Sequence, residues 1–307
     1  MNAQSCNGMG ELFDASPDTL FTVLRSYLDE SGLGKNVQEV LCCIAGFQCR
    51  NSLCIPFQDQ WGKTLAEYGI DEFKSKQFWT VAQDGALTGK YSGWSFGKAN
   101  LFISDLVRLI RGHRCHLLAA VVNLRDFFSY DEDSRRYLTG ASFHIKKQRF
   151  TSSGKPNSAY FTALTAVIGK GVERASKDRQ LCHFIFDEQN EYESLAKSRV
   201  SEMRGHFAGS PLALFLGDVG YSPSHRVLAL QAADLAAHVC KEYYRRKMLG
   251  IPIEIDTTRG LLTPLEIFSH LIDDNDKEFS LFKLEKKEMD AILHLDDAPV
   301  DVPEIKL

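Results

Sequence analysis

Short apolar runs that alternate with longer amphipathic segments place the tightest limit on how this chain folds. The runs have the length and composition of buried strands; they lie at Thr22–Leu28, Glu39–Phe47, His116–Leu124, Cys182–Phe186 and Leu212–Leu216. Apolar residues recur at helical spacing between and after them, at Gln58–Tyr68, Lys98–Arg111, Tyr160–Ala175, Glu188–Met203 and Val227–Lys247. Strands that alternate with helices predict an α/β fold. The glycine-containing stretch Asp29–Gly34 predicts a turn that joins the first two strands as a hairpin.

The chain has 307 residues, 44% of them hydrophobic, which is enough for a large core in a single domain. Residues 1–19 are polar and predict a flexible lead-in, and residues 20–250 carry the alternating pattern. Within that domain, residues 125–157 are polar, aromatic and basic without a clear period, which is typical of an insertion. After Ile251, proline-containing segments lead into an acidic, helix-like tail, so we expect residues 251–307 to form a C-terminal appendage with a frayed end at Asp296–Leu307.

Composition and charge indicate a cytoplasmic protein. The net charge of −4 gives no general sign of affinity for nucleic acid or an anionic membrane. No apolar run approaches the ~18 residues that cross a bilayer, and Met1–Pro17 lacks the basic and apolar regions of a secretory signal. The eight cysteines lie mostly in apolar stretches, which indicates buried thiols in a reducing compartment; Cys42, Cys43, Cys182 and Cys240 are examples. The sequence leaves open whether the chain binds a protein partner or forms a homodimer.

Three aspartates mark the candidate site. Asp29 follows the first apolar run, Asp187 follows the run Cys182–Phe186, and Asp234 lies in the helical segment LQAADLAAH. Carboxylates at the carboxyl ends of neighbouring strands collect where α/β proteins bind their ligands. Like charges so close together require a cation or a shared proton, and Mg²⁺ or Mn²⁺ suits ligands that are all oxygen. The sequence therefore predicts a divalent metal site.

Strand alternation separates the members of each acidic pair. Successive side chains of a strand point to opposite faces, so Asp29 and Glu30 do not share a face if the strand continues through them. We expect Asp29 to bind the metal directly. Glu30 either supports the metal ligands from outside or reaches the metal because the chain bends before Gly32. The same reasoning favours Asp187 over Glu188. An aspartate after a strand also serves as a turn former or helix N-cap, and that alternative suits Asp187.

Asp234 is surrounded by small residues that let its helix pack closely against a sheet. Gln231 lies one turn before it and His238 one turn after it, on the same face. A buried carboxylate without a partner is costly, so we expect either a metal or an arginine beside Asp234.

Together these motifs resemble a known family. YLDESG (27–32), FDE (186–188) and LQAADLAAH (230–238) occur in the order typical of the bacterial and phage domain-of-unknown-function family 3800, over about residues 22 to 245. That family is placed in the ribonuclease H-like superfamily, with metal-dependent nucleases. The resemblance implies a mixed central sheet flanked by helices, and a site at Asp29, Glu30, Asp187 and Asp234, with Gln231 as a contact to the substrate.

The family also carries a Glu followed two places on by His. Glu72–Phe73–Lys74 takes that place here, with Lys74 where the His would stand. A protonated lysine cannot ligate a metal. Glu72 is therefore the further carboxylate, and Lys74 is assigned to a substrate phosphate. The alternative is that both residues decorate an edge strand.

The function that these expectations imply is phosphodiester hydrolysis with two divalent ions. Asp29 bridges both ions, Asp187 and Asp234 each hold one, and Glu72 or Glu30 completes the shell or orients water. Nucleic acid is the expected substrate. The basic segment Phe143–Lys155 is the first choice for its backbone contacts, through Lys146, Lys147 and Arg149, and Tyr243–Arg246 is the second.

Other assignments compete with this one. Gly93–Gly97 matches the G-x-S-x-G nucleophile motif, which requires a preceding strand. Asp29 after a strand suits a haloacid-dehalogenase-like phosphatase, but Ser31 stands where that class has a second Asp. His113, Cys115 and His116 have no matching cysteine pair for zinc. A phosphoesterase of another metal-dependent type, or a non-catalytic nucleic-acid or protein binding module of a defence or mobile-element system, also remains.

Overall fold

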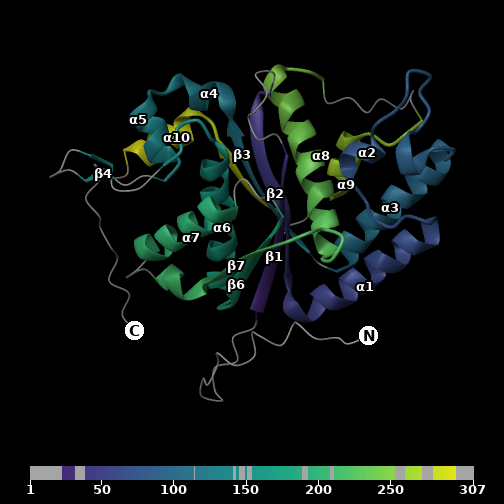
Figure 1. Ribbon diagram of the computed structural model, residues 1–307, viewed down its shortest axis with the longest axis horizontal. Coiled ribbons are helices and arrows are strands. Elements are labelled where there is room, and N and C mark those ends of the chain that lie inside the picture. Colours follow the sequence, from purple (N-terminus) through teal and green to yellow (C-terminus); the bar gives the residue numbers. More distant parts are fainter. Residues whose placement is uncertain are drawn as a thin grey trace, which may run out of the picture.

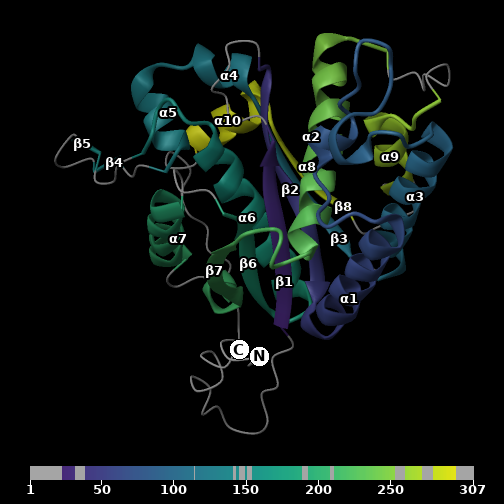
Figure 2. The same cartoon turned by 45° about the vertical axis from the view of Figure 1, so that its right-hand side comes forward.

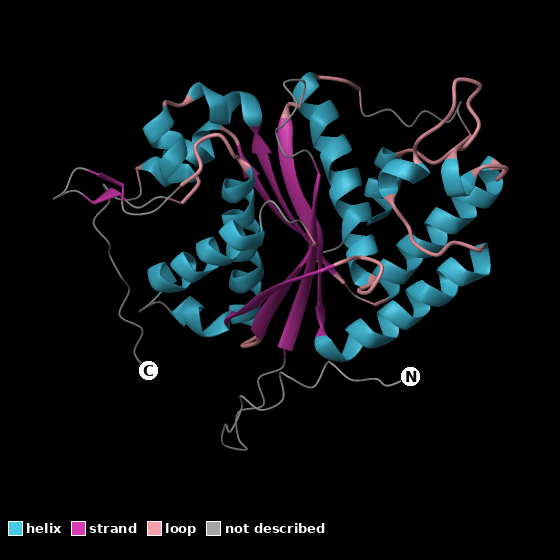
Figure 3. Ribbon diagram, viewed as in Figure 1, coloured by secondary structure: helices cyan, strands magenta, loops and turns pink. Residues whose placement is uncertain are grey.

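A six-stranded mixed sheet runs through the middle of the computed structural model, with helices on both of its faces (Figures 1 and 3). The structure describes residues 23–31, 39–113, 115–140, 143–144, 149–150, 154–188, 193–207, 211–252, 260–271 and 279–294. The α/β class that the alternating pattern predicts is confirmed.

The central strand of the sheet is the first one in the chain. The strands are β1 (Val23–Ser31), β2 (Leu41–Arg50), β3 (His116–Asn123), β6 (Leu181–Asp187), β7 (Leu216–Ser222) and β8 (Phe279–Leu284). Their order is β7-β6-β1-β2-β3-β8. β2 is antiparallel to both of its neighbours, and the pairs β1–β6, β6–β7 and β3–β8 are parallel. The carboxyl ends of β1 and β6 therefore meet at the same edge of the sheet.

One layer of helices packs on each face of the sheet, as the turned view in Figure 2 also shows. The first layer holds α1 (Asn51–Tyr68), α2 (Ser75–Phe78), α3 (Phe96–Gly112), α8 (Ala229–Leu249) and α9 (Pro264–Leu271). The second holds α4 (Leu124–Ser129), α5 (Glu132–Leu138), α6 (Tyr160–Lys177), α7 (Glu193–Phe207) and α10 (Lys286–Leu293). Two short 3-10 turns, Gly89–Tyr91 and Pro211–Phe215, and a ribbon of β4 (Phe143–His144) and β5 (Arg149–Phe150) complete the described elements.

Strand alternation divides the core in two. In β2, Cys43, Ala45 and Phe47 face the α8 layer, while Cys42 and Ile44 face the α6 layer. Helix α8 contacts both β1 and β2. Its inner residues are small and almost fully buried, so its backbone lies close to the sheet; they are Ala232, Ala233, Ala236 and Ala237.

Three expectations from the sequence are wrong. Asp29, Glu30 and Ser31, which were expected to begin a turn, belong to strand β1, and residues 32–34 of that expected turn lie outside the described residues. Residues 211–215 form a 3-10 turn rather than a strand, and β7 begins at Leu216. The expected C-terminal appendage contributes β8 to the main sheet, where it pairs with β3.

Other expectations fall partly on residues that the structure does not describe. The expected insertion, residues 125–157, holds most of α4, all of α5 and the β4–β5 ribbon, while residues 141–142, 145–148 and 151–153 lie outside the described ranges. The lead-in 1–19 and the expected frayed end, Asp296–Leu307, lie outside them as well.

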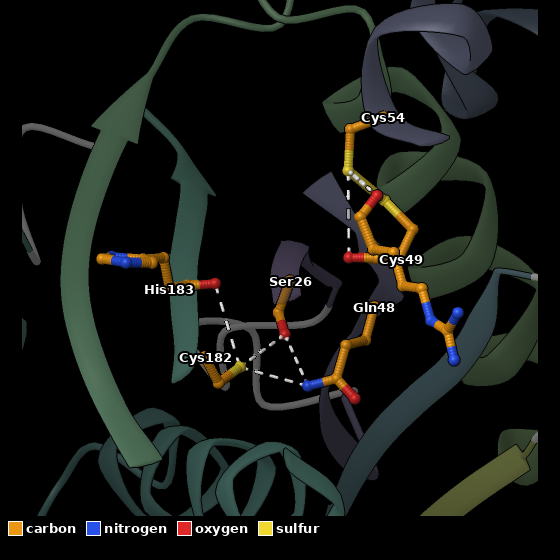
Figure 4. Close-up of a disulfide and its surroundings, with 7 residues drawn as sticks. Ser26, Gln48, Cys49, Cys54, Cys182 and His183 are labelled. Carbon is orange, nitrogen blue, oxygen red and sulfur yellow. Dashed lines mark hydrogen bonds between the residues drawn. A yellow bond between two sulfur atoms is a disulfide. The ribbon is translucent and has the colours of Figure 1, made fainter. Parts of the chain in front are cut away.

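The cysteines follow the sequence expectation only in part. Cys42, Cys43, Cys182 and Cys240 are buried free thiols, as predicted. Cys49 at the end of β2 and Cys54 in the first turn of α1 instead form a disulfide (Figure 4). Beside it, the Gln48 amide donates to Ser26 Oγ at 3.2 Å and to Cys182 Sγ at 3.1 Å, which satisfies polar groups inside the sheet. Within the described residues, no helix has the length and hydropathy to span a membrane.

Gly46 marks the closest approach of β2 to β1 and yields the first prediction. A Cβ atom built there would collide with the Tyr27 carbonyl oxygen and lie 2.9 Å from Leu28 Cα. Because both obstacles are backbone, Gly46→Ala should lower the free energy of unfolding by about 1–3 kcal/mol, the usual cost of overpacking, measured by urea denaturation. Gly169→Ala is the control, since its added methyl meets nothing within 4 Å and lies in helix α6. An unchanged denaturation midpoint for Gly46→Ala would contradict the prediction.

Candidate functional site

Asp29 and Asp187 lie side by side at the edge of the sheet. The register pairs Leu28 with Phe186, so the next residue of each strand is an aspartate. Asp29 follows Tyr27, which faces the α8 layer, by two positions and therefore shares that face. Asp29 is only 8% exposed, and its Oδ1 accepts from the Glu30 backbone N–H at 2.8 Å. The parallel pairing thus brings the two strand-end acids together, as the sequence suggests.

Asp234 approaches the same edge from α8. Its Oδ2 accepts from the Ser75 backbone N–H at 2.6 Å. Burial raises the pKa of Asp234, and the Ser75 N–H and the Lys74 charge oppose that effect. Burial also raises the pKa of Asp29 well above its usual range, and repulsion from Glu30, Asp234 and Asp187 adds to it. The three aspartates therefore form one electrostatic cluster.

Lys74 extends its ammonium group into this cluster. Its Nζ lies 2.7 Å from Ser224 Oγ, 3.3 Å from Asp187 Oδ2 and 3.5 Å from Glu72 Oε1. Ser224 Oγ in turn donates to Glu72 Oε1 at 2.8 Å. The segment that carries Glu72 and Lys74 is a loop before α2 rather than an edge strand, so the alternative of a decorated edge strand is wrong.

Ser224 is the residue that sequence reasoning missed. Its hydroxyl links Lys74 to Glu72, and its backbone N–H donates to Asp187 Oδ1 at 3.0 Å. Asp187 Oδ1 also accepts from the Glu188 N–H at 3.0 Å, so this carboxylate holds the turn after β7 rather than capping a helix. The available signal was the Ser-Pro-Ser turn that precedes α8.

Gln231 holds the loop in place and does not fit the substrate contact that the sequence predicts. It is fully buried. Its Oε1 accepts from Trp61 Nε1 at 3.2 Å and from the Phe73 backbone N–H at 2.9 Å, and its Nε2 donates to the Ser224 carbonyl at 3.1 Å. One amide thereby joins α1, the Glu72–Lys74 loop and the Ser224 turn to α8.

Glu30 extends toward the opposite face, as alternation predicts. Leu28, two residues earlier, packs in the α6 layer, and the charge of Glu30 helps to raise the pKa of Tyr160 on α6. Burial and then repulsion from Asp187 raise the pKa of Glu30 to about 8. Its Oε1 is buried and has no hydrogen-bond partner among the described residues. Glu188, by contrast, is exposed.

The expected substrate contacts lie elsewhere or outside the described residues. Lys146 and Lys147 fall outside them, and of Arg149 only the backbone, in β5, is described. The second choice, Tyr243–Arg246, is largely engaged: Arg245 and Arg246 both pair with Glu242, at 2.8 Å and 3.0 Å. This set therefore offers less positive charge than its sequence suggests.

The competing motifs adopt structural roles. Ser95 of the G-x-S-x-G match caps α3 by accepting from the Lys98 backbone N–H at 3.2 Å, and a 3-10 turn rather than a strand precedes it. His116 is buried in β3. His238, on the Asp234 face of α8, stacks on Trp79 with ring centroids 4.8 Å apart, and burial lowers its pKa to about 4.

The chemistry of the donors suits a hard divalent ion, although the side chains do not enclose one. All the acids of the cluster offer oxygen ligands, and the buried Glu30 Oε1 lacks a partner in the described part of the chain. In the same residues, no three His, Cys, Asp or Glu side chains converge as a ready metal-binding group. The carboxylates would have to turn inward to hold a cation.

Comparison with known proteins adds no further constraint. No protein-family model and no curated protein sequence matches the chain. The resemblance to family 3800 therefore stays a prediction that rests on the three short motifs.

The buried Gln231 amide yields a prediction about stability. Gln231→Leu keeps the volume but leaves the Trp61 Nε1–H and the Phe73 N–H without their shared acceptor. Buried donors without a partner cost about 1–3 kcal/mol each, so the free energy of unfolding should fall by at least one such loss. Urea denaturation measures it, with Gln77→Leu, at an exposed position of α2, as the control. Equal stability of Gln231→Leu and the parent chain would show that the amide does not hold the loop.

The raised pKa of Glu30 predicts how the stability of the metal-free protein depends on pH. The folded pKa of about 8 exceeds the ordinary 4.5, so the folded state binds the proton more tightly than the unfolded state. The stability from protonated Glu30 is complete below the unfolded pKa and is lost as pH rises through about 8. With a chelator present, urea denaturation should show Glu30→Gln gaining stability relative to the parent chain as pH rises across that window. Glu188→Gln should not, because its side chain is exposed.

Proposed function

We propose that this chain is a metal-dependent nuclease that hydrolyses phosphodiester bonds at the cluster of Asp29, Asp187 and Asp234. The observation that carries the proposal is the concentration of acidic side chains at one sheet edge, where Asp29 is buried and Asp187 and Asp234 are partly buried. Asp29, Asp187 and Asp234 come from β1, β6 and α8, and burial together with mutual repulsion raises the pKa of Asp29. Such an arrangement is stabilised by a cation, and Mg²⁺ or Mn²⁺ suits its oxygen ligands.

The sheet supports placing the domain among ribonuclease H-like folds. β1, β2 and β3 form an antiparallel meander, and β6 and β7 extend it in parallel beside β1. Asp29 and Asp187 stand at the adjoining ends of β1 and β6, which are the first and fourth strands of this five-strand unit. The resemblance implies acids at these two positions. Strand β8 is an addition at the far edge.

The side chains have separable tasks in the proposed reaction. The oxygens of Asp29, Asp187 and Asp234 would hold the metal, which supplies Lewis-acid stabilisation of the phosphate and a more acidic water. Glu30 would orient the attacking water from beside Asp29, since its buried Oε1 has no hydrogen-bond partner among the described residues. The Lys74 ammonium, with 32% of its side chain exposed, offers a positive charge to a phosphate oxygen.

Charge-neutral variants test this proposal. Loss of a residue that only supports a metal ligand lowers activity roughly 10- to 100-fold. Asp29→Asn and Asp234→Asn should each lower cleavage of single-stranded, duplex or hybrid oligonucleotides by more than that. The assay uses Mg²⁺ and Mn²⁺ in separate arms. Asp218→Asn, in β7 and 64% exposed, is the matched control and should retain full activity. Equal activity of Asp29→Asn and the parent chain would remove Asp29 from the reaction.

One observation favours the second candidate, a binding module without turnover. Lys74 already neutralises part of the cluster's charge through its ion pairs with Asp187 and Glu72. A binding module that needs no metal would use such a lysine as the counter-charge of its acids. Under this alternative the parent chain binds the oligonucleotides and cleaves none of them in either metal arm.

A further inference from the structure

The acids of the cluster fall into two groups that differ in their cationic partners. On one side, Glu72 and Asp187 both lie within ion-pair distance of Lys74 Nζ, at 3.5 Å and 3.3 Å. On the other side, Asp29 and Asp234 accept hydrogen bonds from backbone N–H groups, at 2.8 Å and 2.6 Å. Glu30 Oε1 has no partner at all among the described residues. Lys74 Nζ therefore makes its direct contacts with Glu72 and Asp187, while its charge acts on Asp234 from farther away.

The loop around Lys74 is held from both sides by α8. The N–H of the preceding residue, Phe73, donates to Gln231 Oε1 at 2.9 Å, and the N–H of the following residue, Ser75, donates to Asp234 Oδ2 at 2.6 Å. The Lys74 carbonyl accepts from the N–H groups of the first turn of α2. The backbone of Lys74 is thus fixed by the helix that carries the acidic site, and the contacts of its Nζ with Ser224 and Asp187 hold the ammonium group there.

We infer that Lys74 permanently occupies one of the two cation positions of this cluster, so that the site takes a single divalent ion, on the side of Asp29 and Asp234. The inference rests on the proposed function and narrows it from two ions to one. Lys74 Nζ donates to Ser224 Oγ and Asp187 Oδ2. A metal ion at this position would bind the same oxygens. An ammonium has three N–H donors, so the remaining one can serve a phosphate oxygen where a second ion would otherwise bind it.

The chemical consequence is that the Lys74 ammonium, a fixed positive charge, replaces a second divalent ion, which could exchange with solvent. A lysine orients a phosphate and balances the charge that develops on it, but it cannot make a bound water more acidic as a divalent ion does. Asp29 and Asp234 would hold the ion that supplies the more acidic water. The proposed site would be asymmetric, with one metal for the water and the Lys74 ammonium for the position of the substrate.

Manganese titration of the full-length chain tests this inference without an activity assay. After chelator treatment, calorimetry and electron paramagnetic resonance of free Mn²⁺ count the bound ions. We expect one ion in the parent chain and two in Lys74→Met, because Glu72 and Asp187 then lack their cation. Lys74→Arg keeps the charge and should bind one. Lys170→Met is the matched control, since Lys170 pairs with Glu173 at 2.7 Å on α6, in the other helix layer, and should also bind one.

The outcomes separate this inference from the proposed function. Two ions in the parent chain would overturn the role of Lys74 and leave the metal-dependent function standing. One ion in both the parent chain and Lys74→Met would also overturn it. No ion in the parent chain would overturn the proposed function itself. If Lys74→Met fails to fold, Lys74→Gln, which keeps an N–H donor for Ser224, replaces it with the same expected count of two.

Discussion

The close contact between the alanine face of α8 and strands β1 and β2 brings every part of the site together. Ala232, Ala233, Ala236 and Ala237 are nearly or fully buried against the sheet, and larger residues there would push the helix outward. The same helix carries Asp234 and Gln231, which bind the backbone on either side of Lys74. The position of the site loop therefore follows from the packing of apolar residues that have no chemistry of their own.

Burial gives the acids of this edge properties that they would lack at a surface. A carboxylate removed from water favours its neutral form, and burial is the largest influence on the pKa of Asp29, Glu30 and Asp234 alike. Neighbouring charges reinforce it, since Asp29 is repelled by three other acids. A cation that enters such a site replaces protons and relieves repulsion at the same time. The stability of the fold and the affinity for the cation are therefore coupled through the same side chains.

Features that depend on local pattern could be predicted from the sequence, and those that depend on tertiary contact could not. The α/β class and the positions of Asp29 and Asp187 followed from apolar runs and the residues that end them. The role of Gln231 could not be predicted, because its partners Trp61 and Phe73 lie more than 150 residues away in the chain. Strand β8 was missed for the same reason: its pairing partner β3 is distant in sequence. Ser224 had only a turn signal, which says nothing about which carboxylate it would contact.

Lys74 shows how the side chain at one position can determine the character of a site while the backbone around it is held independently. At this position a histidine would offer a neutral nitrogen that can ligate a metal, whereas a lysine offers a charge that excludes one. The loop that presents the residue is held by Gln231 and Asp234 through backbone N–H groups, and these bonds do not depend on which side chain stands between them. Selection can therefore exchange a ligand for a fixed cation here without disturbing the fold. The carboxylates of Glu72 and Asp187 would be satisfied by either kind of positive charge, and in the proposed site this choice would determine how many ions bind.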